Sequence, residues 1–413
     1  VRAGPARRAA RRGRFGKVPA MAKDELRIGV IGSGGRGSLA AHAHRPAEGV
    51  RLVAGADVVP AAREAFRARY GPEAFVTDDY RELLARGDVD AVFVTSPDYC
   101  HEEHAVAALS AGKHVYLEKP MAITTAGCDR ILQAARRAGV KLYLGHNMRH
   151  MSFVRKMKEL IDAGAIGEPK VGWCRHFVSY GGDAYFKDWH AERARSTGLL
   201  LQKGAHDIDV LHWLCGGYSR RVTGMGGLTL YDRITDRHAP NERGDAGWHV
   251  EHWPPLSQKG LNPVIDVEDV SMMLMELDNG VFASYQQCHY APDGWRNYTV
   301  IGTEGRVENF GDCPGDCEIV LWDRRCGYKA RGDRTFPIPA VEGGHGGADP
   351  SIVAEFVRYV RQGGKVATSP VAARYSVAAG CAATESIRDG SRPRDVPPLP
   401  ADLRAHFEKD VAA

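Results

Sequence analysis

The sequence predicts an α/β fold with a doubly wound parallel sheet, followed by an α+β domain whose sheet is mainly antiparallel. Residues 23–147 alternate short apolar runs rich in β-branched residues with helical segments, a pattern typical of a parallel sheet covered by helices. After residue 150, short strands follow one another with few helices between them, which indicates antiparallel pairing. The length of 413 residues exceeds what one hydrophobic core usually holds, so two domains are expected.

The first strand and the glycines after it predict a dinucleotide-binding site. LRIGVIG is a predicted strand, Gly32-Ser33-Gly34-Gly35-Arg36-Gly37 spells G-x-G-x-x-G, and SLAAHAHRPAEG is a predicted helix. The first glycine allows the tight turn, the second lets the backbone approach a pyrophosphate, and the third lets the helix pack on the strand. The helix N-terminus adds N–H donors and a partial positive charge. This order is typical of a Rossmann domain, with cofactor contacts expected at Gly32, Ser33, Gly34, Gly35 and Arg36.

The second strand predicts which dinucleotide binds. VRLVAGAD ends at Asp57, where a carboxylate is placed to accept hydrogen bonds from both ribose hydroxyls. The same carboxylate repels a 2′-phosphate, and the residues that follow, Val58 and Val59, are not basic. We therefore expect NAD in preference to NADP.

Further strands at 90–95, 114–118 and 141–147 continue the alternating pattern. Ligands of such sheets bind beyond the carboxyl ends of the strands. Polar residues at or just after these ends are therefore expected at the cofactor, namely Thr95, Ser96, Asp98, His101, Glu118, Lys119 and Asn147.

The second part of the chain has predicted strands and two closing helices. The strands are Lys170–Tyr180, Arg221–Leu230, Val270–Leu277, Val281–Cys288, Tyr298–Ile301 and Ile319–Trp322, and the helices are Ser351–Gln362 and Val371–Asp389. Residues 232–267 are a long polar stretch, which is usually functional or disordered. We place the Rossmann domain at 23–147, a substrate-binding and oligomerisation domain at 148–400, and a tail at 401–413.

The charge distribution argues against nucleic-acid binding. The formal net charge of +4 arises from the first 20 residues, which hold seven basic and no acidic residues. Without them, 48 basic residues stand against 51 acidic ones, so the folded body is mildly acidic. Residues 1–22 are expected to be a disordered basic extension, with a nucleic-acid-binding tail as the alternative. A twin-arginine signal needs an apolar stretch that GKVPAMAKDEL lacks.

Neither a membrane span nor a metal site is expected. No run of about 18 apolar residues occurs. Among nine cysteines, only Cys313, Cys317 and Cys326 cluster, with looser spacing and fewer ligands than a structural zinc site offers. Reduced thiols in a cytoplasmic protein are the expected state.

GSGGRG, Asp57, TSPDYCHEEHAVAALSAGKHV and above all the EKP turn resemble the glucose–fructose oxidoreductase/inositol dehydrogenase/MocA (Gfo/Idh/MocA) family over roughly residues 25–215. The resemblance implies that Lys119 of EKP lies between nicotinamide and substrate and that Pro120 follows a cis bond. It also implies a large open sheet in the second domain. One face of that sheet would lie over the cofactor and the other would support a homo-oligomer, a dimer or tetramer.

LLLQKGAHDIDVLHWLCG (199–216) resembles the family motif D-x-G-x-H-x-x-D. Gly204, His206 and Asp209 match its last three marks, whereas Gln202 stands where polyol dehydrogenases commonly have aspartate. Oxidation of an alcohol requires removal of its proton while hydride leaves the carbon. An ammonium at Lys119 would stabilise the developing alkoxide, and an imidazole at His206 with a near-neutral pKa would take the proton. Gln202 cannot titrate but can hydrogen-bond a hydroxyl.

Other residues of this region are candidates for substrate contact. Together with Lys119, Gln202 and His206, the expected substrate contacts are Arg149, Trp189 and His345. Several further cations, Lys203 among them, could meet an anionic group such as a carboxylate or sulfonate, although most are expected to be solvated. Asp207 and His212 are expected to be ordinary residues of the following helix.

These features predict an NAD-dependent oxidoreductase that oxidises a secondary hydroxyl of a sugar, a cyclitol or a sugar derivative. The alternative resembles the family's NAD-dependent glycoside hydrolases, which use transient C3 oxidation, elimination, water addition and re-reduction, here on a substrate that includes anionic sugars. The GxGGRG pattern and Gln202 favour this alternative. A protein that holds NAD without turnover is a third interpretation, and the intact Lys119 and His206 argue against it.

Overall fold

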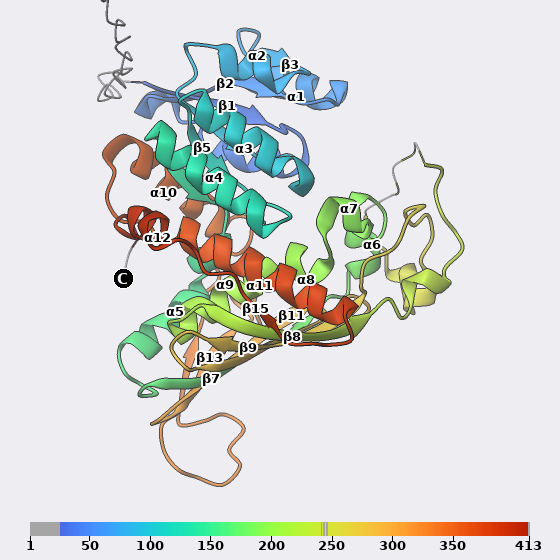
Figure 1. Ribbon diagram of the computed structural model, residues 1–413, viewed down its shortest axis with the longest axis vertical. Helices are drawn as coiled ribbons and strands as arrows, with labels where there is room; N and C mark the ends of the chain where they lie inside the picture. The colour runs from blue at the N-terminus through green and yellow to red at the C-terminus, as the bar shows by residue number, and fades with distance from the viewer. Residues whose placement is uncertain (1–24, 241, 243, 245–246, 412–413) are drawn as a thin grey trace, which may run out of the picture.

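The computed structural model describes residues 25–240, 242, 244 and 247–411. The extension expected at residues 1–22 lies outside the described residues. Figure 1 shows a sheet built from the first part of the chain, a larger sheet built from the second part, and α11 running between them. The predicted fold class, a Rossmann parallel sheet followed by an α+β domain, is confirmed.

The first sheet has six parallel strands in the order β3-β2-β1-β4-β5-β6. The order reverses beside β1, which creates the crevice where dinucleotides bind in doubly wound sheets. The strands are β1 Leu26–Ile31, β2 Val50–Ala56, β3 Phe75–Thr77, β4 Ala91–Val94, β5 His114–Leu117 and β6 Leu142–Leu144. The helices that connect them are α1 Pro60–Tyr70, α2 Tyr80–Ala85, α3 His101–Ser110 and α4 Thr125–Ala138, with the 3-10 turn η3 Asp98–Cys100 before α3.

The helix after the glycines differs from the predicted one. It is a 3-10 helix, η1 Gly35–Ala43, followed by the short turn η2 Pro46–Glu48. The break falls at Arg45, because the residue before a proline is disfavoured in the helical region.

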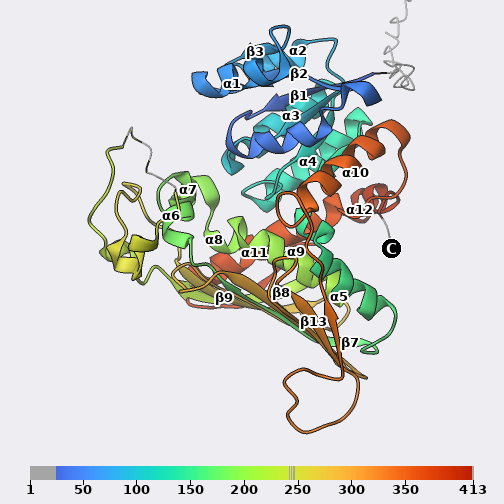
Figure 2. The ribbon, with the colours of Figure 1, turned by 180° about the vertical axis from the view of Figure 1, so that it is seen from behind.

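One face of the first sheet is covered by a helix from the C-terminal part of the sequence. Ile352, Val353 and Phe356 of α10 Ala348–Gln362 share one core cluster with β1, β4 and η1. Although it follows all strands of the second sheet except β15 in the chain, α10 therefore packs on the first sheet, as Figure 2 shows from behind. This return brings the segment before α10 to the glycine loop.

The second sheet has nine strands in the order β14-β13-β12-β11-β7-β10-β9-β8-β15. All neighbours are antiparallel except β7 and β10, so the prediction of a large, mainly antiparallel sheet is confirmed. The strands are β7 Pro169–Phe177, β8 Ser219–Gly227, β9 Val270–Leu277, β10 Phe282–Cys288, β11 Trp295–Gly302, β12 Arg306–Phe310, β13 Glu318–Trp322, β14 Arg334–Pro337 and β15 Arg394–Asp395.

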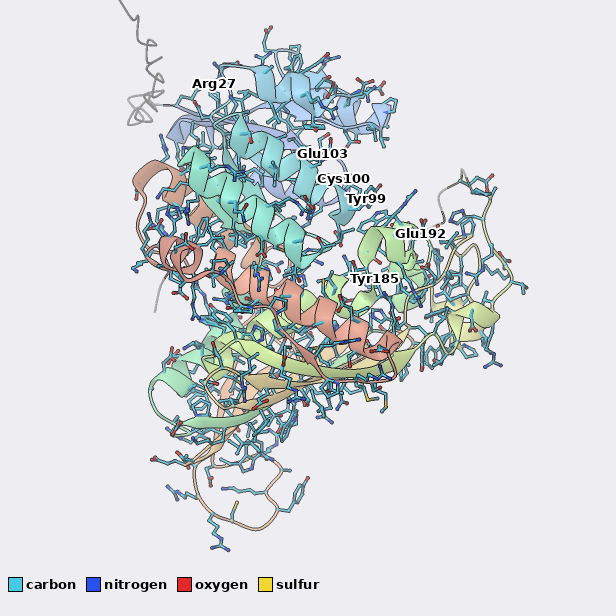
Figure 3. The ribbon with its side chains drawn as sticks, in the orientation of Figure 1. Arg27, Tyr99, Cys100, Glu103, Tyr185 and Glu192 are labelled. Atoms are coloured by element: carbon cyan, nitrogen blue, oxygen red, sulfur yellow. The ribbon has the colours of Figure 1, made fainter. Side chains whose placement is uncertain are left out.

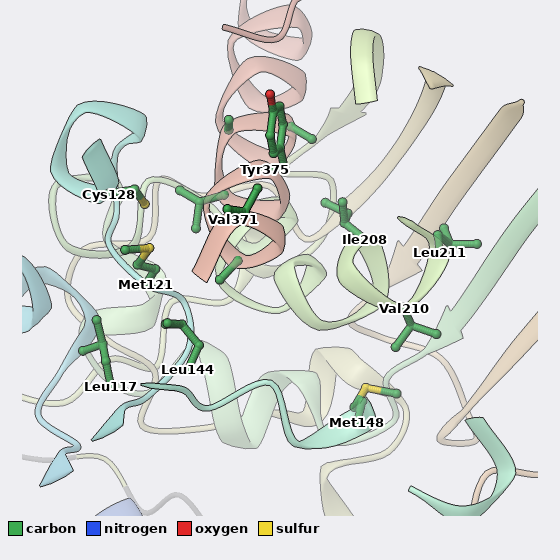
Figure 4. Packing of buried hydrophobic residues seen from close by; sticks show 14 of the residues in the cluster. Leu117, Met121, Cys128, Leu144, Met148, Ile208, Val210, Leu211, Val371 and Tyr375 are labelled. Carbon is green, nitrogen blue, oxygen red and sulfur yellow. The ribbon is translucent and has the colours of Figure 1, made fainter. Parts of the chain in front are cut away.

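A helical layer separates the two sheets. Val371 and Tyr375 of α11 Pro370–Arg388 belong to the same core cluster as Leu117 and Leu144 of the first sheet and Ile208 of α9 Gly204–Cys215 (Figure 4). Alanine-rich α11 is buried on nearly all sides, which allows α4, α9 and β8 to approach it closely. This layer fixes the Rossmann sheet relative to α9, which carries His206.

The remaining elements lie around this frame. They are η4 Asn147–His150, α5 Ser152–Asp162, α6 Gly181–Tyr185, η5 Trp189–Ala191, α7 Arg193–Ser196, α8 Leu199–Gln202, η6 Tyr231–Arg233, η7 Val250–His252, η8 Pro255–Ser257 and α12 Ala401–Glu408. The last of these lies in the segment predicted as a tail, and its Leu403 is buried. None of the helices in the described part of the chain is long and apolar enough to cross a membrane.

Candidate active site

The glycine loop has the close approaches that exclude side chains. A Cβ on Gly32, whose φ is +84°, would lie 2.6 Å from the amide nitrogen of Ser96, and a Cβ on Gly37 would lie 2.2 Å from the carbonyl oxygen of Gly32. A Cβ on Gly35 would meet nothing within 4 Å, so the loop is open on its outer side. The loop is therefore packed tightly against the strand ends and leaves its outer surface free for a ligand.

Asp57 lies where the sequence predicts, directly after β2. Its carboxylate accepts hydrogen bonds from the amides of Gly34 (3.0 Å) and Val59 (2.9 Å). These bonds fix the carboxylate at the rim of the glycine loop. Val58 beside it is uncharged and 79% exposed, and Arg63 of α1 donates to the main-chain carbonyl of Asp57 (2.6 Å).

The residues of the loop fit a bound dinucleotide. The open outer side at Gly35 gives a pyrophosphate room, and the buried Oγ of Ser33 has no hydrogen-bond partner among the described residues. The fixed carboxylate of Asp57 gives a ribose its acceptors. Gly34, Gly35, Ser33 and Asp57 are thus the residues that could hold the cofactor.

Arg36 differs from expectation. Its Nε donates to Glu118 (2.8 Å), and its two terminal nitrogens donate to both carboxylate oxygens of Asp349 (2.8 and 3.0 Å). Asn147 also donates to Asp349 (3.1 Å). The guanidinium of Arg36 thus joins the glycine loop, the EKP turn and α10, so the cofactor contact expected at Arg36 stays a prediction.

Three other predicted cofactor residues brace the strand ends with their side chains. The hydroxyl of Thr95 donates to the carbonyl of Gly32 (2.8 Å), and Ser96 bonds His104 (2.8 Å). Both ring nitrogens of the buried His101 are taken, by the carbonyls of Ser96 (2.8 Å) and Pro120 (2.7 Å). These side chains shape the site rather than present free donors to a ligand.

Lys119 lies in the EKP turn after β5, and its peptide bond to Pro120 is cis, as the family resemblance implies. Its Nζ donates to the main-chain carbonyl of Gln202 (3.2 Å). Burial lowers the pKa of Lys119 to about 8; the carboxylate of Asp98 opposes this shift and the charge of Lys203 adds to it. The main-chain amide of Lys119 donates to Glu118 (3.0 Å), which Arg36 also holds.

Asp98 lies with the substrate candidates rather than with the dinucleotide loop. It is buried, and it lies close enough to Lys119, His190 and the side chain of Gln202 for all three to act on it. Burial raises the pKa of Asp98 despite these partners, and its Oδ2 has no hydrogen-bond partner among the described residues. A carboxylate thus stands beside the position where Gln202 replaces an aspartate.

His206 lies in the first turn of α9, close enough to Lys119 for the charge of that lysine to act on it. Burial lowers the pKa of His206 well below its usual value, and the positive charges of Lys119, Lys203 and Arg296 lower it further. The near-neutral pKa predicted for this imidazole is therefore wrong, because it lies among cations. Within the described chain, its Nδ1 and the Oε1 of Gln202 have no hydrogen-bond partner.

Arg149 is not free to meet a substrate, contrary to the prediction. Its guanidinium forms a bidentate pair with Asp209 (2.7 and 2.8 Å) and donates to the carbonyl of Ala367 (2.9 Å). Both charged groups are buried. The pair anchors α9 to η4, and Asp209 is the last residue of the G-x-H-x-x-D motif.

The predicted Trp189 and His345 lie on two sides of the site. Trp189 stacks on His190 (3.7 Å between ring centroids) and meets Tyr99 edge-on. His345 bonds Asp349 (2.8 Å) and lines a cavity of about 220 Å³ with His176, Tyr180, Trp295 and Arg296. Figure 3 shows Tyr99 and Cys100 on the side of the first domain that faces Tyr185 and Glu192 near α6 and α7.

The structure adds residues that sequence reasoning assigned to solvent or to ordinary helix packing. Asp207 is fully buried and binds Arg296 (2.9 Å), Tyr285 (2.9 Å), Tyr298 and His176. Arg296 and His176 hold the pKa of Asp207 well below its usual value although burial opposes this. Lys203 and His289 are also buried beside these groups. For Asp207 and Lys203 the sequence signal was the density of polar residues in 199–216, whereas His289 had none, because the partners of these residues are distant along the chain.

A Rossmann sheet with an open glycine loop next to a partly buried lysine and histidine is the arrangement of a nicotinamide-dinucleotide-dependent oxidoreductase. Comparison with known families agrees: residues 26–146 match the NAD-binding Rossmann fold of the Gfo/Idh/MocA oxidoreductase family, and residues 158–396 match its C-terminal alpha/beta domain. The chain belongs to the Gfo/Idh/MocA oxidoreductase family.

Individual relatives are more distant. The Bacillus subtilis (strain 168) protein named "Putative oxidoreductase YteT" is 27% identical over 323 residues, 68% of this chain and 75% of YteT. Inositol 2-dehydrogenase of Ralstonia nicotianae is 35% identical over 222 residues, 53% of this chain and 61% of that enzyme, so the match spans less than two thirds of it. A levoglucosan dehydrogenase solved with NADH and levoglucosan is 22% identical, covers 91% of this chain and 100% of its own, and superimposes with a TM-score of 0.72, which shows the shared fold.

Proposed function

We propose that this protein is an NAD-dependent oxidoreductase that oxidises a secondary hydroxyl of a sugar, a cyclitol or a sugar derivative. The observation that carries the proposal is the partly buried ammonium of Lys119 beside the glycine loop, with His206 close enough to be affected by its charge. The orphan polar atoms of Asp98, Gln202 and His206 support a ligand with several hydroxyls. Inositol and levoglucosan, named for two relatives, are both polyhydroxylated.

Different side chains of the site have different roles in removing the proton of the substrate hydroxyl. When bound, the nicotinamide supplies the hydride acceptor. Lys119, with Lys203 behind it, stabilises the negative charge that develops on the substrate oxygen and so makes the alcohol more acidic. His206 is the neutral imidazole that accepts the proton. Gln202 and Asp98 orient neighbouring hydroxyls through the atoms that lack partners in the described chain.

NAD should bind at least about tenfold more tightly than NADP. Burying a phosphate against the carboxylate of Asp57 costs about 1–3 kcal/mol or more, since Val58 and Val59 offer no counter-charge. Calorimetric titration of both cofactors checks this, and Asp57→Ser should narrow the difference. Equal affinity of the unaltered protein for both would contradict the assignment.

The proposed reaction has a direct assay. The protein is incubated with NAD and a panel of free sugars, cyclitols and aryl glycosides, while NADH and released aglycone are followed together. A dehydrogenase accumulates NADH in proportion to the substrate consumed. Release of aglycone without net NADH would instead identify the protein as a redox-neutral glycosidase. Absence of reaction with every compound of the panel would contradict the proposed substrate class.

We also propose that the outer face of the second sheet joins copies of the chain into a homo-oligomer. Met225, Met272, Leu274 and Phe282 lie on this face on neighbouring strands and are 48–66% exposed. Exposed apolar patches of this kind usually mark interaction surfaces.

Leu274→Glu should lower the solution mass from that of a dimer or tetramer, because it buries a charge in the proposed contact. Tyr328→Glu is the matched control, since Tyr328 is 98% exposed and lies outside this face. Sedimentation velocity measures the mass of each variant. A monomeric wild-type protein would contradict the proposal.

A further inference from the structure

Lys203, between α8 and α9, is a buried cation without a carboxylate. The residue is 8% exposed, and its Nζ lies 5.4 Å from the ring centroids of both Tyr180 and Tyr185. The charge of Lys203 acts on the Tyr185 phenol and opposes the rise in pKa that burial causes there. Within the described residues, no carboxylate lies at ion-pair distance from its ammonium. Such a group is costly to bury unless something else supplies the negative charge.

The other buried cations of this region are paired, which makes Lys203 an exception. Lys187 has Asp183 at 3.1 Å, Arg149 has Asp209 at 2.7 Å, and Arg296 has Asp207 at 2.9 Å. The negative charge of Asp98 acts on Lys119 and favours its ammonium form. Lys203, in contrast, acts on Lys119 only as a second positive charge. The fold therefore supplies an anion for each of the others and leaves one cation for a ligand.

His289 gives an independent indication of a ligand. It is 0% exposed, and neither ring nitrogen has a hydrogen-bond partner among the described residues. Its ring meets that of Tyr185 edge-on at 5.2 Å, and the charge of Lys203 acts on it. Buried polar atoms are nearly always satisfied in native proteins, so a polar group from outside the chain is expected between His289 and Lys203.

The position of this pair relates it to the reacting hydroxyl. The charge of Lys203 acts on both Lys119 and His206, so an anion bound at Lys203 would belong to the same small molecule whose hydroxyl meets those two residues. One ammonium with a phenol and an imidazole matches the single charge of a carboxylate. A phosphate dianion would call for more positive charge than this subsite holds.

We infer that Lys203 and His289 bind a carboxylate of the substrate, which makes the substrate a polyhydroxylated acid of the uronic or aldonic type. The class of reaction rests on the proposed function, whereas the binding of the acid does not. Lys203 donates to one carboxylate oxygen, and His289, as a neutral imidazole, donates to the other.

The first test compares turnover of matched pairs. D-glucuronate with D-glucose, and D-galacturonate with D-galactose, are assayed with NAD for the unaltered protein and for Lys203→Met. The unaltered protein should show a higher kcat/KM for each acid, and Lys203→Met should lower the acid-to-neutral ratio by about 10- to 100-fold, as expected for loss of a charged hydrogen bond. The ratio cancels any effect of Lys203 on Lys119. Lys170→Met, an exposed lysine of β7, is the control and should leave the ratio unchanged.

The second test measures binding without turnover. Calorimetry gives the Kd of each acid and each neutral sugar for the protein saturated with NADH. Acids that bind in a Lys203-dependent way but are not oxidised would support the subsite and contradict the proposed oxidoreductase reaction. Oxidation of neutral sugars with no tighter binding of the acids would contradict the subsite alone. Failure of every acid to bind, or preferential binding of glucose 6-phosphate, would also overturn the inference.

Stability separates a binding role from a structural one. Methionine is similar in volume to lysine, so Lys203→Met should unfold at the same temperature as the unaltered protein or higher, since it removes a buried unpaired charge. His289→Phe gives a second variant that should weaken acid binding several-fold. A large loss of stability in Lys203→Met with unchanged acid selectivity would show that Lys203 supports the fold instead.

Discussion

Lys119→Ala is expected to lower kcat by about 10²–10⁴-fold while NAD still binds. The ammonium lies partly buried just after the carboxyl end of β5, where water screens its charge less than at the surface, and its Nζ donates to the carbonyl of Gln202. The variant removes this charge from the transition state but leaves the contacts of the glycine loop and Asp57 intact.

The pH dependence of kcat/KM gives a second readout for the same variant. Burial and the charge of Lys203 lower the pKa of Lys119 to about 8, so the protonated form needed for charge stabilisation is present below this pH and is lost above it. Activity should therefore fall as the pH rises through about 8, and Lys119→Ala should lack this limb. Lys141→Ala, a partly exposed lysine of the same domain, is the control. A rise in activity through the same pH would show that neutral Lys119 is itself the base.

His206→Ala is expected to lower kcat by a similar factor of about 10²–10⁴, because it removes the proton acceptor. Burial and the surrounding cations keep the pKa of His206 well below its usual value, so the imidazole is neutral throughout the neutral range. The loss should therefore be nearly constant between pH 6 and 8, and only an acid limb below this range should disappear. Steady-state kinetics at saturating NAD measures both effects.

The outcome for His206→Ala is informative either way. Retention of near-wild-type kcat and of the acid limb would show that His206 packs without taking the proton. His190 would then be the next candidate, because it lies within range of Asp98 and its Nδ1 bonds Asp188. His345 lies farther from this group, at the cavity lined by Arg296, and is engaged by Asp349.

The parts of the fold that the sequence predicts are those with a strong local pattern. The strand LRIGVIG, the glycines and Asp57 follow one another within a few dozen residues, and their structural order is the predicted one. Strands β3, β12, β14 and β15 were missed, since they are short and their pairing is set by the neighbouring strands rather than by their own composition. The placement of α10 on the first sheet has no local signal either, because its partners lie some 300 residues earlier.

The residues of the candidate site also fall into two groups, those with a local sequence pattern and those whose partners are distant along the chain. Lys119 and His206 were found through the EKP and G-x-H-x-x-D patterns, each read within a few residues. The engagement of Arg36 by Asp349 could not be foreseen, as the two are 313 residues apart. The same holds for Lys203 beside His289, and for Asp207 beside Arg296. A pKa such as that of His206 depends on these distant charges, which is why its predicted near-neutral value was wrong.

The central claim is that Lys119 and His206 act on one hydroxyl. The most direct test is the pre-steady-state rate of NADH formation, at saturating NAD and with the best substrate of the panel, for the unaltered protein, Lys119→Ala, His206→Ala and the double variant. Residues that act as a unit are strongly non-additive, so the double variant should be no more than a few-fold slower than the slower single variant. A double variant whose loss equals the product of the two single losses would contradict the claim and place the two residues in separate roles.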